Sequence, residues 1–402
     1  MICRRYVRYY PEQFADMERL LRDSALAKDA VAEFEQAVAQ SCRRRHAVAV
    51  ASGRQGMAYL FAALDLKPGD EIIFPAYTLK DLVILAQQCG YRPVLADIDR
   101  ATLNMAPAQL AAVLTPRTRA VVATHMFGVP CPVREISELT RPRGIKVIED
   151  CAHAFGAAVA GRPVGSFGDA AFFSFELTKT VNTFGGGVMV TDDDAVARAL
   201  RTRVAQLPLA PARVAHKVRA AAREQVLLGS RLFGWSAWLF YFNWTTRWVN
   251  RAYRAAQSRG RLQDVQYHSA QAYVGLRQLA ALPERERRRA RAAEQLRQLC
   301  PVEMCWQQPV PETRVNNYFA VPRFPGLSAA RARQLFLRHG VDVGVGEEIV
   351  DDCRMVVPGP PCPAAQAAFR EAVQLPLHEE LTEVQLAHIA AACRAVVGTA
   401  RL

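Results

Sequence analysis

Short apolar runs alternate with amphipathic segments between about residues 47 and 190, and this alternation constrains the fold most strongly. The runs are Glu71–Phe74, Pro93–Ala96, Ala120–Ala123, Lys146–Ile148 and Gly187–Val190. Most of their residues are apolar, as expected for strands covered on both faces, and the segments between them predict helices. The pattern therefore predicts an α/β fold with a mostly parallel sheet. Ligands of such sheets bind at the carboxyl ends of the strands.

Reactive residue types cluster where those strand ends are expected. Glu149 and Asp150 follow one run, and Lys179 lies between Ser174 and the glycines Gly185–Gly187. An amine can form a Schiff base with an aldehyde, a carboxylate can pair with a pyridinium nitrogen, and hydroxyl and backbone donors can bind phosphate. Together these residues predict a pyridoxal phosphate site. Taken alone, Asp150 is also compatible with a helix cap, and Lys179 with a solvent-facing lysine.

The length of 402 residues exceeds what one hydrophobic core usually spans, so two domains are expected. We predict a large cofactor-binding domain over residues 1–204, an insertion over 205–262 and a smaller C-terminal α+β domain over 263–402. In the C-terminal part the pattern predicts a strand over 317–321 and an amphipathic helix over 382–396.

Ten cysteines are scattered along the chain without a C-x-x-C pair. This spacing favours reduced thiols over a disulfide framework or a zinc site, so we expect no metal centre. Residues 1–6 have no apolar run behind their arginines and do not predict a secretory signal. We therefore expect a cytoplasmic protein.

The net charge of +13 favours an anionic partner, such as a nucleotide-bearing substrate, a phospholipid surface or a nucleic acid. Much of the charge lies in one predicted helix, in Arg285, Arg287, Arg288, Arg289 and Arg291. We interpret this run as a solvated helical face. Because no zinc finger or RNA-binding aromatic signature accompanies it, nucleic acid is not an expected partner.

Four of the five tryptophans fall within residues 226–249. The uncharged stretch between Arg231 and Arg247 has 15 residues, fewer than the roughly 20 needed to span a bilayer. Aromatic residues flanked by arginines suit a helix that lies in a membrane interface and gives peripheral membrane contact. The alternative is a helix that packs within the protein or against a dimer partner.

Ordered motifs along nearly the whole chain resemble the DegT/DnrJ/EryC1/StrS family of sugar aminotransferases. The segments that carry the resemblance are 51–53, 68–78, 94–99, 148–157, 161–179, 271–279 and 375–378. The resemblance implies the fold of the fold-type I pyridoxal phosphate-dependent transferases. It also implies a homodimer, because each active site in this family is built from two subunits.

Three residues receive chemical roles from this resemblance. Lys179 corresponds to the lysine that forms the Schiff base and moves a proton between substrate and cofactor. Asp150 corresponds to the acid that keeps the pyridine nitrogen protonated, and His153 lies where a donor near the cofactor's phenolic oxygen is expected. The neighbouring Glu149 is interpreted as structural.

The resemblance also implies a phosphate site. Ser174 would donate to the phosphate, while Gly53 and Arg54 replace the usual Gly-Thr pair at a helix N-terminus. Leu79 stands where the family commonly has an aromatic residue that stacks on the pyridine ring. Asp264 replaces an asparagine that reaches the neighbouring subunit's phosphate, and we expect Arg54 to supply the compensating charge.

A last departure is Gly185, which stands where the family usually has a glutamate. We expect a pyridoxal phosphate-dependent aminotransferase that takes an amino group from an amino acid, plausibly glutamate by resemblance, and passes it to a carbonyl sugar, most plausibly nucleotide-linked. One alternative acceptor is a lipid-linked or other hydrophobic carbonyl compound, which the tryptophan-rich segment would suit. A second alternative is a regulatory protein that binds the cofactor without turnover.

Overall fold

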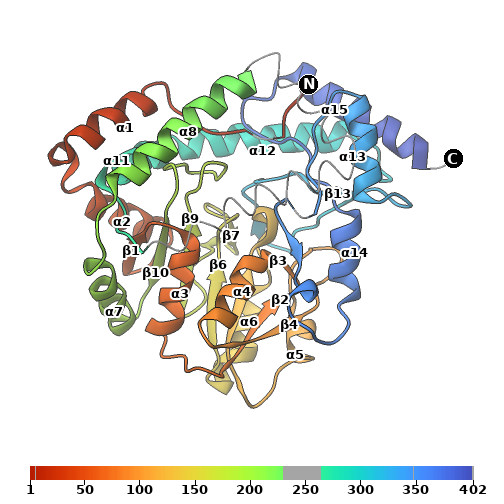
Figure 1. Cartoon of the computed structure of the whole chain (residues 1–402). Coiled ribbons are helices and arrows are strands. Elements are labelled where there is room, and N and C mark those ends of the chain that lie inside the picture. The colour runs from red at the N-terminus through yellow and green to blue at the C-terminus, as the bar shows by residue number, and fades with distance from the viewer. Residues whose placement is uncertain (5, 230–263, 347, 401–402) are drawn as a thin grey trace.

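The structure, a computed structural model, describes residues 1–4, 6–229, 264–346 and 348–400. Its centre is a seven-stranded sheet (Figure 1), in which the four pairings among β2, β4, β5, β6 and β9 are parallel. The pairings of β10 with β9 and β1 are antiparallel. In spatial order the strands are β1 (His46–Val50), β10 (Gly187–Thr191), β9 (Ala170–Ser174), β6 (Lys146–Asp150), β5 (Thr118–Thr124), β2 (Glu71–Pro75) and β4 (Arg92–Ala96). The predicted α/β class, the mostly parallel sheet and all five predicted runs are confirmed.

Helices cover both faces of this sheet. Successive residues of a strand point to opposite faces, so neighbouring residues belong to different core clusters. Phe172 belongs to the core cluster under α3 (Gly53–Ala63), α4 (Lys80–Gln88) and α7 (Asp194–Ala205). The next residue, Phe173, belongs to the cluster under α1 (Gln13–Arg22), α2 (Ala30–Ser41) and α11 (Ser269–Ala280). On that second face, α5 (Pro107–Ala111) and α6 (Val133–Thr140) cover the strands nearer β4.

The C-terminal part forms its own core around α12 (Leu282–Leu299), α13 (Ala329–Arg338) and α15 (Glu383–Ala400), and α14 (Pro363–Glu371) packs against the large sheet's core. Its short strands are β11 (Cys305–Trp306), β12 (Thr313–Arg314), β13 (Pro322–Arg323) and β14 (Asp351–Asp352). Two of them reach back to the large sheet's domain, since β14 pairs with β3 (Tyr77–Thr78) and β12 pairs with β7 (Ala158–Val159), which continues to β8 (Arg162–Pro163).

Of the C-terminal predictions, the helix over 382–396 is confirmed by α15, and the strand over 317–321 is wrong. Asn317 has a left-handed φ of 52°, which interrupts extended backbone, and only Ala320 forms an isolated bridge, to Leu375. The domain boundaries stay a prediction. The packing of α11 against α2 places residues 269–280 with the large sheet.

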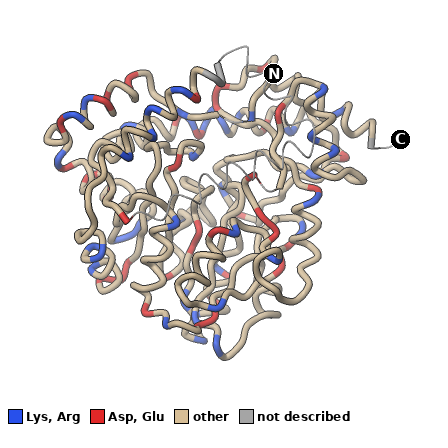
Figure 2. The backbone as a smooth tube through the Cα atoms, viewed as in Figure 1, with Lys and Arg blue, Asp and Glu red and all other residues tan. Residues whose placement is uncertain are grey.

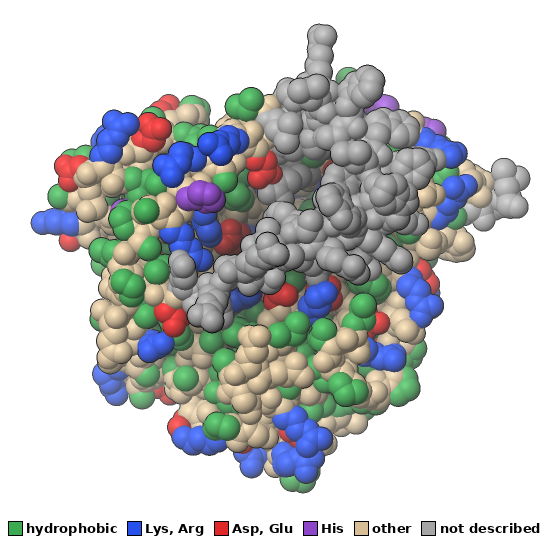
Figure 3. Space-filling model, viewed as in Figure 1, with side chains coloured by type: hydrophobic (Ala, Val, Ile, Leu, Met, Phe, Trp, Pro, Cys, Tyr) green, Lys and Arg blue, Asp and Glu red, His purple; other side chains and the backbone are tan. Residues whose placement is uncertain are grey.

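The arginine run 285–291 on α12 is not the fully solvated face that the sequence predicts. Arg287 and Arg288 are exposed on α12 and pair with Glu284, but Arg289 is completely buried and Arg285 is half-buried. Basic residues recur along both α12 and α8 (Pro211–Gly229) in Figure 2. On the face drawn in Figure 3, blue, red and green side chains are interspersed, so the described part of this face shows no continuous basic patch.

The tryptophan-rich segment lies almost entirely outside the described residues, so the interfacial helix stays a prediction. None of the described helices is both long and apolar enough to cross a membrane.

Helices α2 and α11 pack closely because Gly275 has no side chain. A Cβ atom at this position would lie 2.5 Å from the ring of the fully buried Phe34. We predict that Gly275→Ala lowers the unfolding free energy by about 1–3 kcal/mol, because the core has no room for the methyl group. Gly398→Ala is the matched helical control, since nothing lies within 4 Å of its added Cβ. Equal denaturation midpoints for the two variants would contradict the prediction.

Candidate active site

Three polar residues lie at the carboxyl ends of neighbouring parallel strands, on the sheet face that α3 covers. They are Thr124 on β5, Asp150 on β6 and Ser174 on β9. Each lies two residues after a residue of the core cluster under α3, namely Val122, Ile148 and Phe172. Because the side-chain period of a strand is two, these side chains project to the same side. The fold thus assembles the site at the strand ends, as the sequence predicts.

Asp150 is a buried acid with few partners. The only hydrogen bond that its side-chain carboxylate accepts from another described residue comes from the backbone amide of Ala152, at 3.0 Å. Burial raises the pKa of this carboxyl, and the Ala152 amide and the charge of Lys179 only partly offset that effect. Thr124 lies opposite Asp150 in the register of β5 and β6. Its side-chain hydroxyl is buried and has no hydrogen-bond partner among the described residues. A cation beside Asp150 would therefore stabilise its ionised form.

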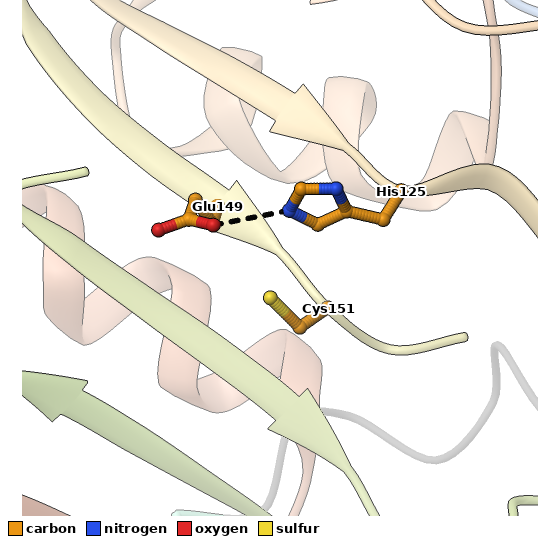
Figure 4. A group of neighbouring side chains, drawn as sticks. All are labelled: His125, Glu149 and Cys151. Atoms are coloured by element: carbon orange, nitrogen blue, oxygen red, sulfur yellow. Dashed lines mark hydrogen bonds and ion pairs between the residues drawn. The ribbon is translucent and has the colours of Figure 1, made fainter. Parts of the chain in front are cut away.

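The side chain of Glu149 points to the opposite face of the sheet and forms hydrogen bonds with backbone amides. Its carboxylate accepts hydrogen bonds from the amides of Gly165, Phe167 and Gly168 at 2.7, 2.7 and 2.8 Å. His125 Nε2 lies 3.1 Å from the same carboxylate (Figure 4). The interpretation of Glu149 as a structural residue agrees with these contacts.

The ligand atoms of His125, Glu149 and Cys151 lie within 4.8 Å of one another, which is close enough for a metal ion (Figure 4). Two of these residues are already engaged. The amide of Cys131 donates to His125 Nδ1 at 3.1 Å, so Nε2 carries the proton and donates to Glu149. Since Glu149 also accepts three amides, we infer that the cluster is a structural network rather than a metal centre.

Lys179 lies in the loop between β9 and β10, and its side chain is half-buried. Its Nζ atom is 5.2 Å from the ring centroid of Tyr318. The hydroxyl of the preceding Thr178 lies 3.4 Å from the Tyr318 hydroxyl. Tyr318 therefore forms one wall beside the lysine, a role that its position in a mispredicted strand did not reveal.

His153 lies against the same tyrosine. Its ring stacks on Tyr318 with centroids 4.8 Å apart, and it is nearly parallel to Phe127 at 6.0 Å. Burial, followed by the charge of Lys179, holds the pKa of His153 well below its ordinary value, so the ring is neutral. The charge of Lys179 thus acts on both Asp150 and His153. The role of His153 at the cofactor's phenolic oxygen stays a prediction.

The N-terminus of α3 completes the site. Ser52 caps this helix and forms a bridge with Gly186, while a Cβ atom on Gly53 would lie 3.5 Å from Cβ of Ser174. A Cβ atom on Gly187 would lie 3.1 Å from the amide nitrogen of Gly53. The glycines therefore let the lysine loop approach a helix end whose amides suit an anion.

The remaining predicted residues lie near this helix with partners of their own. Arg54 Nη1 is 2.8 Å from Asp81, and Leu79 precedes α4 with its side chain partly buried. Asp264 accepts hydrogen bonds from Gln55 and Arg203 at 3.3 and 3.2 Å. Within one chain Arg54 and Asp264 thus have other ionic partners. Their expected pairing across a subunit boundary stays a prediction.

A buried charge cluster beneath the lysine loop escaped sequence reasoning. Arg8 donates to Glu379 at 3.0 Å and to the carbonyl oxygen of Thr178 at 3.2 Å. Arg289 lies 3.6 Å from the same Glu379 carboxylate and donates to the carbonyl oxygen of Asn316 at 2.7 Å. Burial, reinforced by Arg8, lowers the pKa of Arg289 to about 10. Residues from both ends of the chain therefore fix the loop that carries Lys179.

The fold is one that aminotransferases share. The chain belongs to the DegT/DnrJ/EryC1/StrS aminotransferase family, whose model matches residues 10–231. It is 39% identical over 171 residues to GDP-perosamine synthase of Caulobacter vibrioides. The aligned residues make up 42% of this chain and 46% of that relative. The match thus spans less than half of the relative's length.

Solved structures share the fold over the whole chain. The aminotransferase TlmJ from Streptoalloteichus hindustanus has a TM-score of 0.79 at 23% identity, with 100% of both chains covered. DesI, solved in the presence of its TDP-sugar product, has a TM-score of 0.75 at 26% identity, covering 99% of this chain and 94% of DesI. The predicted family and its fold are confirmed.

The Glu149 network generates a prediction about pH. Burial would raise the pKa of Glu149, but hydrogen bonds from His125, Gly168 and Gly165 outweigh it and hold the pKa below the ordinary 4.5. A lowered pKa contributes stability above the unfolded-state value, and this contribution is lost as pH falls through the folded-state value. We predict that Glu149→Gln costs roughly 2–4 kcal/mol at pH 7.

The difference between wild type and Glu149→Gln should shrink as pH falls below about 4.5, because the unfolded-state carboxyl then becomes protonated while the folded one stays ionised down to its lowered pKa. Urea denaturation at a series of pH values measures both effects. A difference in unfolding free energy that is constant between pH 7 and pH 3 would contradict the assigned role.

Proposed function

We propose that this protein is a pyridoxal phosphate-dependent aminotransferase that transfers an amino group to a nucleotide-linked sugar. The observation that carries the proposal is that the charge of Lys179 acts on buried Asp150, while the glycines of the same loop lie against the N-terminus of α3. The names of two relatives support the acceptor class, since one is a GDP-perosamine synthase and the other was solved with a TDP-sugar product. The assignment of glutamate as donor rests on the family resemblance.

The residues fit the cofactor on three counts. Asp150 is a buried carboxyl that needs a nearby cation, which a protonated pyridine nitrogen supplies. The Ser174 hydroxyl has no hydrogen bond to another described residue and lies next to Gly53, so it is free to donate to a phosphate. Lys179 Nζ forms no ion pair with another described residue and is available to an aldehyde.

When bound, pyridoxal phosphate supplies an electron sink for the carbanion that forms at the substrate carbon. The protein's residues prepare this chemistry. Asp150 would hold the pyridine nitrogen of this group protonated, and Lys179 would hold the group through its aldehyde and supply at Nζ the base that moves a proton. Tyr318 covers one side of that atom, and the His153 ring stacks on Tyr318.

We also propose a homodimer, because Asp264 lies where the family places a residue that reaches the neighbouring subunit. The membrane contact of residues 226–249 and a hydrophobic acceptor stay alternatives that depend on residues outside the described ranges. A regulatory protein without turnover is the other alternative. It would bind the cofactor but release no keto acid from any amino acid.

We predict that Lys179→Ala abolishes amino transfer. Wild type supplied with pyridoxal phosphate and glutamate should release 2-oxoglutarate, and the variant should release none, because no other described amine is placed to make the covalent link. Borohydride reduction followed by mass spectrometry should attach the cofactor to wild type alone. Normal release of 2-oxoglutarate by the variant would exclude Lys179 from the reaction.

We predict that Asp150→Asn slows amino transfer but leaves the cofactor bound. A neutral amide cannot hold the pyridine nitrogen protonated, so single-turnover rates should fall by at least about 100-fold, the usual size of a general acid or base contribution. Cofactor binding should persist, because Ser174, Gly53 and Lys179 are unchanged. Asp65→Asn is a control that removes an exposed carboxylate in the loop before β2. An Asp150→Asn variant with wild-type rates would remove Asp150 from its assigned role.

A further inference from the structure

Helix α8 places one cation directly against the lysine loop. Lys217 Nζ lies 3.0 Å from Oε1 of Glu176, three residues before Lys179. The two side chains are 30% and 44% exposed, so the pair is only partly screened by water. Lys217 belongs to the segment that follows the sheet, in which the sequence suggested no chemistry.

The glycine run connects Lys217 to the phosphate end of the site. A Cβ atom on Gly185 would overlap Lys217 Nζ, so the ammonium lies directly over this glycine. The next glycine, Gly186, bridges to Ser52, the capping residue of α3, and Gly187 lies against the amide of Gly53. The ammonium group is therefore one residue away from the backbone that lines the N-terminus of α3.

This geometry also explains Gly185 itself. A side chain at this position would occupy the place of the Lys217 ammonium, and its φ of 114° disfavours any residue with a Cβ. The same hypothetical Cβ atom would lie 3.2 Å from Glu176 Oε1. The loop thus carries its carboxylate on Glu176, whereas the family usually carries a glutamate at the position of Gly185.

We propose that Lys217 binds the phosphate group of the cofactor and is supplied by α8 of the same subunit. The inference rests on the proposed function, because it assumes that the cofactor's phosphate lies at Ser174 and the N-terminus of α3. It assigns a local cation to a site where Arg54 is engaged with Asp81 and where Asp264 replaces an amide.

Glu176 and a bound phosphate carry the same sign of charge and compete for Lys217. Burial would raise the pKa of Glu176, but Lys217, Arg54 and Lys179 lower it further, so the carboxylate is ionised at neutral pH. The two partners of this ion pair should therefore affect phosphate binding in opposite directions. A purely structural ion pair would instead give the same direction for both, because losing either partner would loosen the loop.

The test is a titration of the full-length apo-protein with pyridoxal phosphate, followed by absorbance. Lys217→Met should weaken binding by about three- to fivefold, and Glu176→Gln should tighten it by a similar factor, as expected for a partly exposed charge. Lys217→Arg should keep most of the wild-type affinity because it retains the cation. Lys146→Met is the matched control, since Lys146 pairs with Asp169 at 2.9 Å with similar exposure at the opposite end of β6.

A parallel titration with pyridoxal, which lacks the phosphate, separates the possible causes. Both aldehydes link to Lys179, so an effect on the lysine would appear with both, whereas an effect on the phosphate appears only with pyridoxal phosphate. The inference is overturned if Lys217→Met binds pyridoxal phosphate like wild type, if both variants weaken binding, or if pyridoxal responds equally. Wild type that binds no pyridoxal phosphate would instead overturn the proposed function.

Discussion

The hydrogen bonds to Glu149 are the interaction on which the site depends most. One buried carboxylate holds three backbone amides of the turn before β9 and one imidazole from the end of β5. These bonds join β5, β6 and the approach to β9 at the carboxyl ends of the strands, where parallel sheets generally bind ligands. Because Asp150 follows Glu149 in an extended strand, fixing Glu149 on one face also fixes Asp150 on the other. The fold thus orients Asp150, the candidate acid, through its neighbour Glu149.

The lysine loop is held from a second direction by buried charge. Arg8 near the start of the chain and Arg289 on α12 share the single carboxylate of Glu379, which lies near the end. Two of the Arg289 nitrogens have no hydrogen-bond partner among the described residues. Such an arrangement is expensive to bury and gives little net stability, but it specifies geometry. It places the carbonyl of Thr178, and with it Lys179, relative to the C-terminal core.

Close backbone packing allows these elements to meet. Gly186 and Gly187 let the loop lie against the cap and the first amide of α3, and Gly185 leaves room for Lys217 from α8. The segment after the sheet is therefore part of the site's electrostatic environment. The same packing gives Glu176, three residues before Lys179, a cationic partner on α8.

The sequence by itself determined the sheet and the strand ends at which the candidate site lies, and it predicted roles for Asp150 and Lys179. Apolar runs and their spacing are local properties, and strand parity then places Thr124, Asp150 and Ser174 on one face. Only the tertiary structure decided that Arg289 is buried, that Tyr318 flanks the lysine and that Lys217 lies over Gly185. These contacts join residues far apart in the chain, and a charged or aromatic side chain carries no local signal of which distant group it will meet. The same reason explains the false strand at 317–321, where the conformation follows from docking against the site rather than from the local apolar pattern.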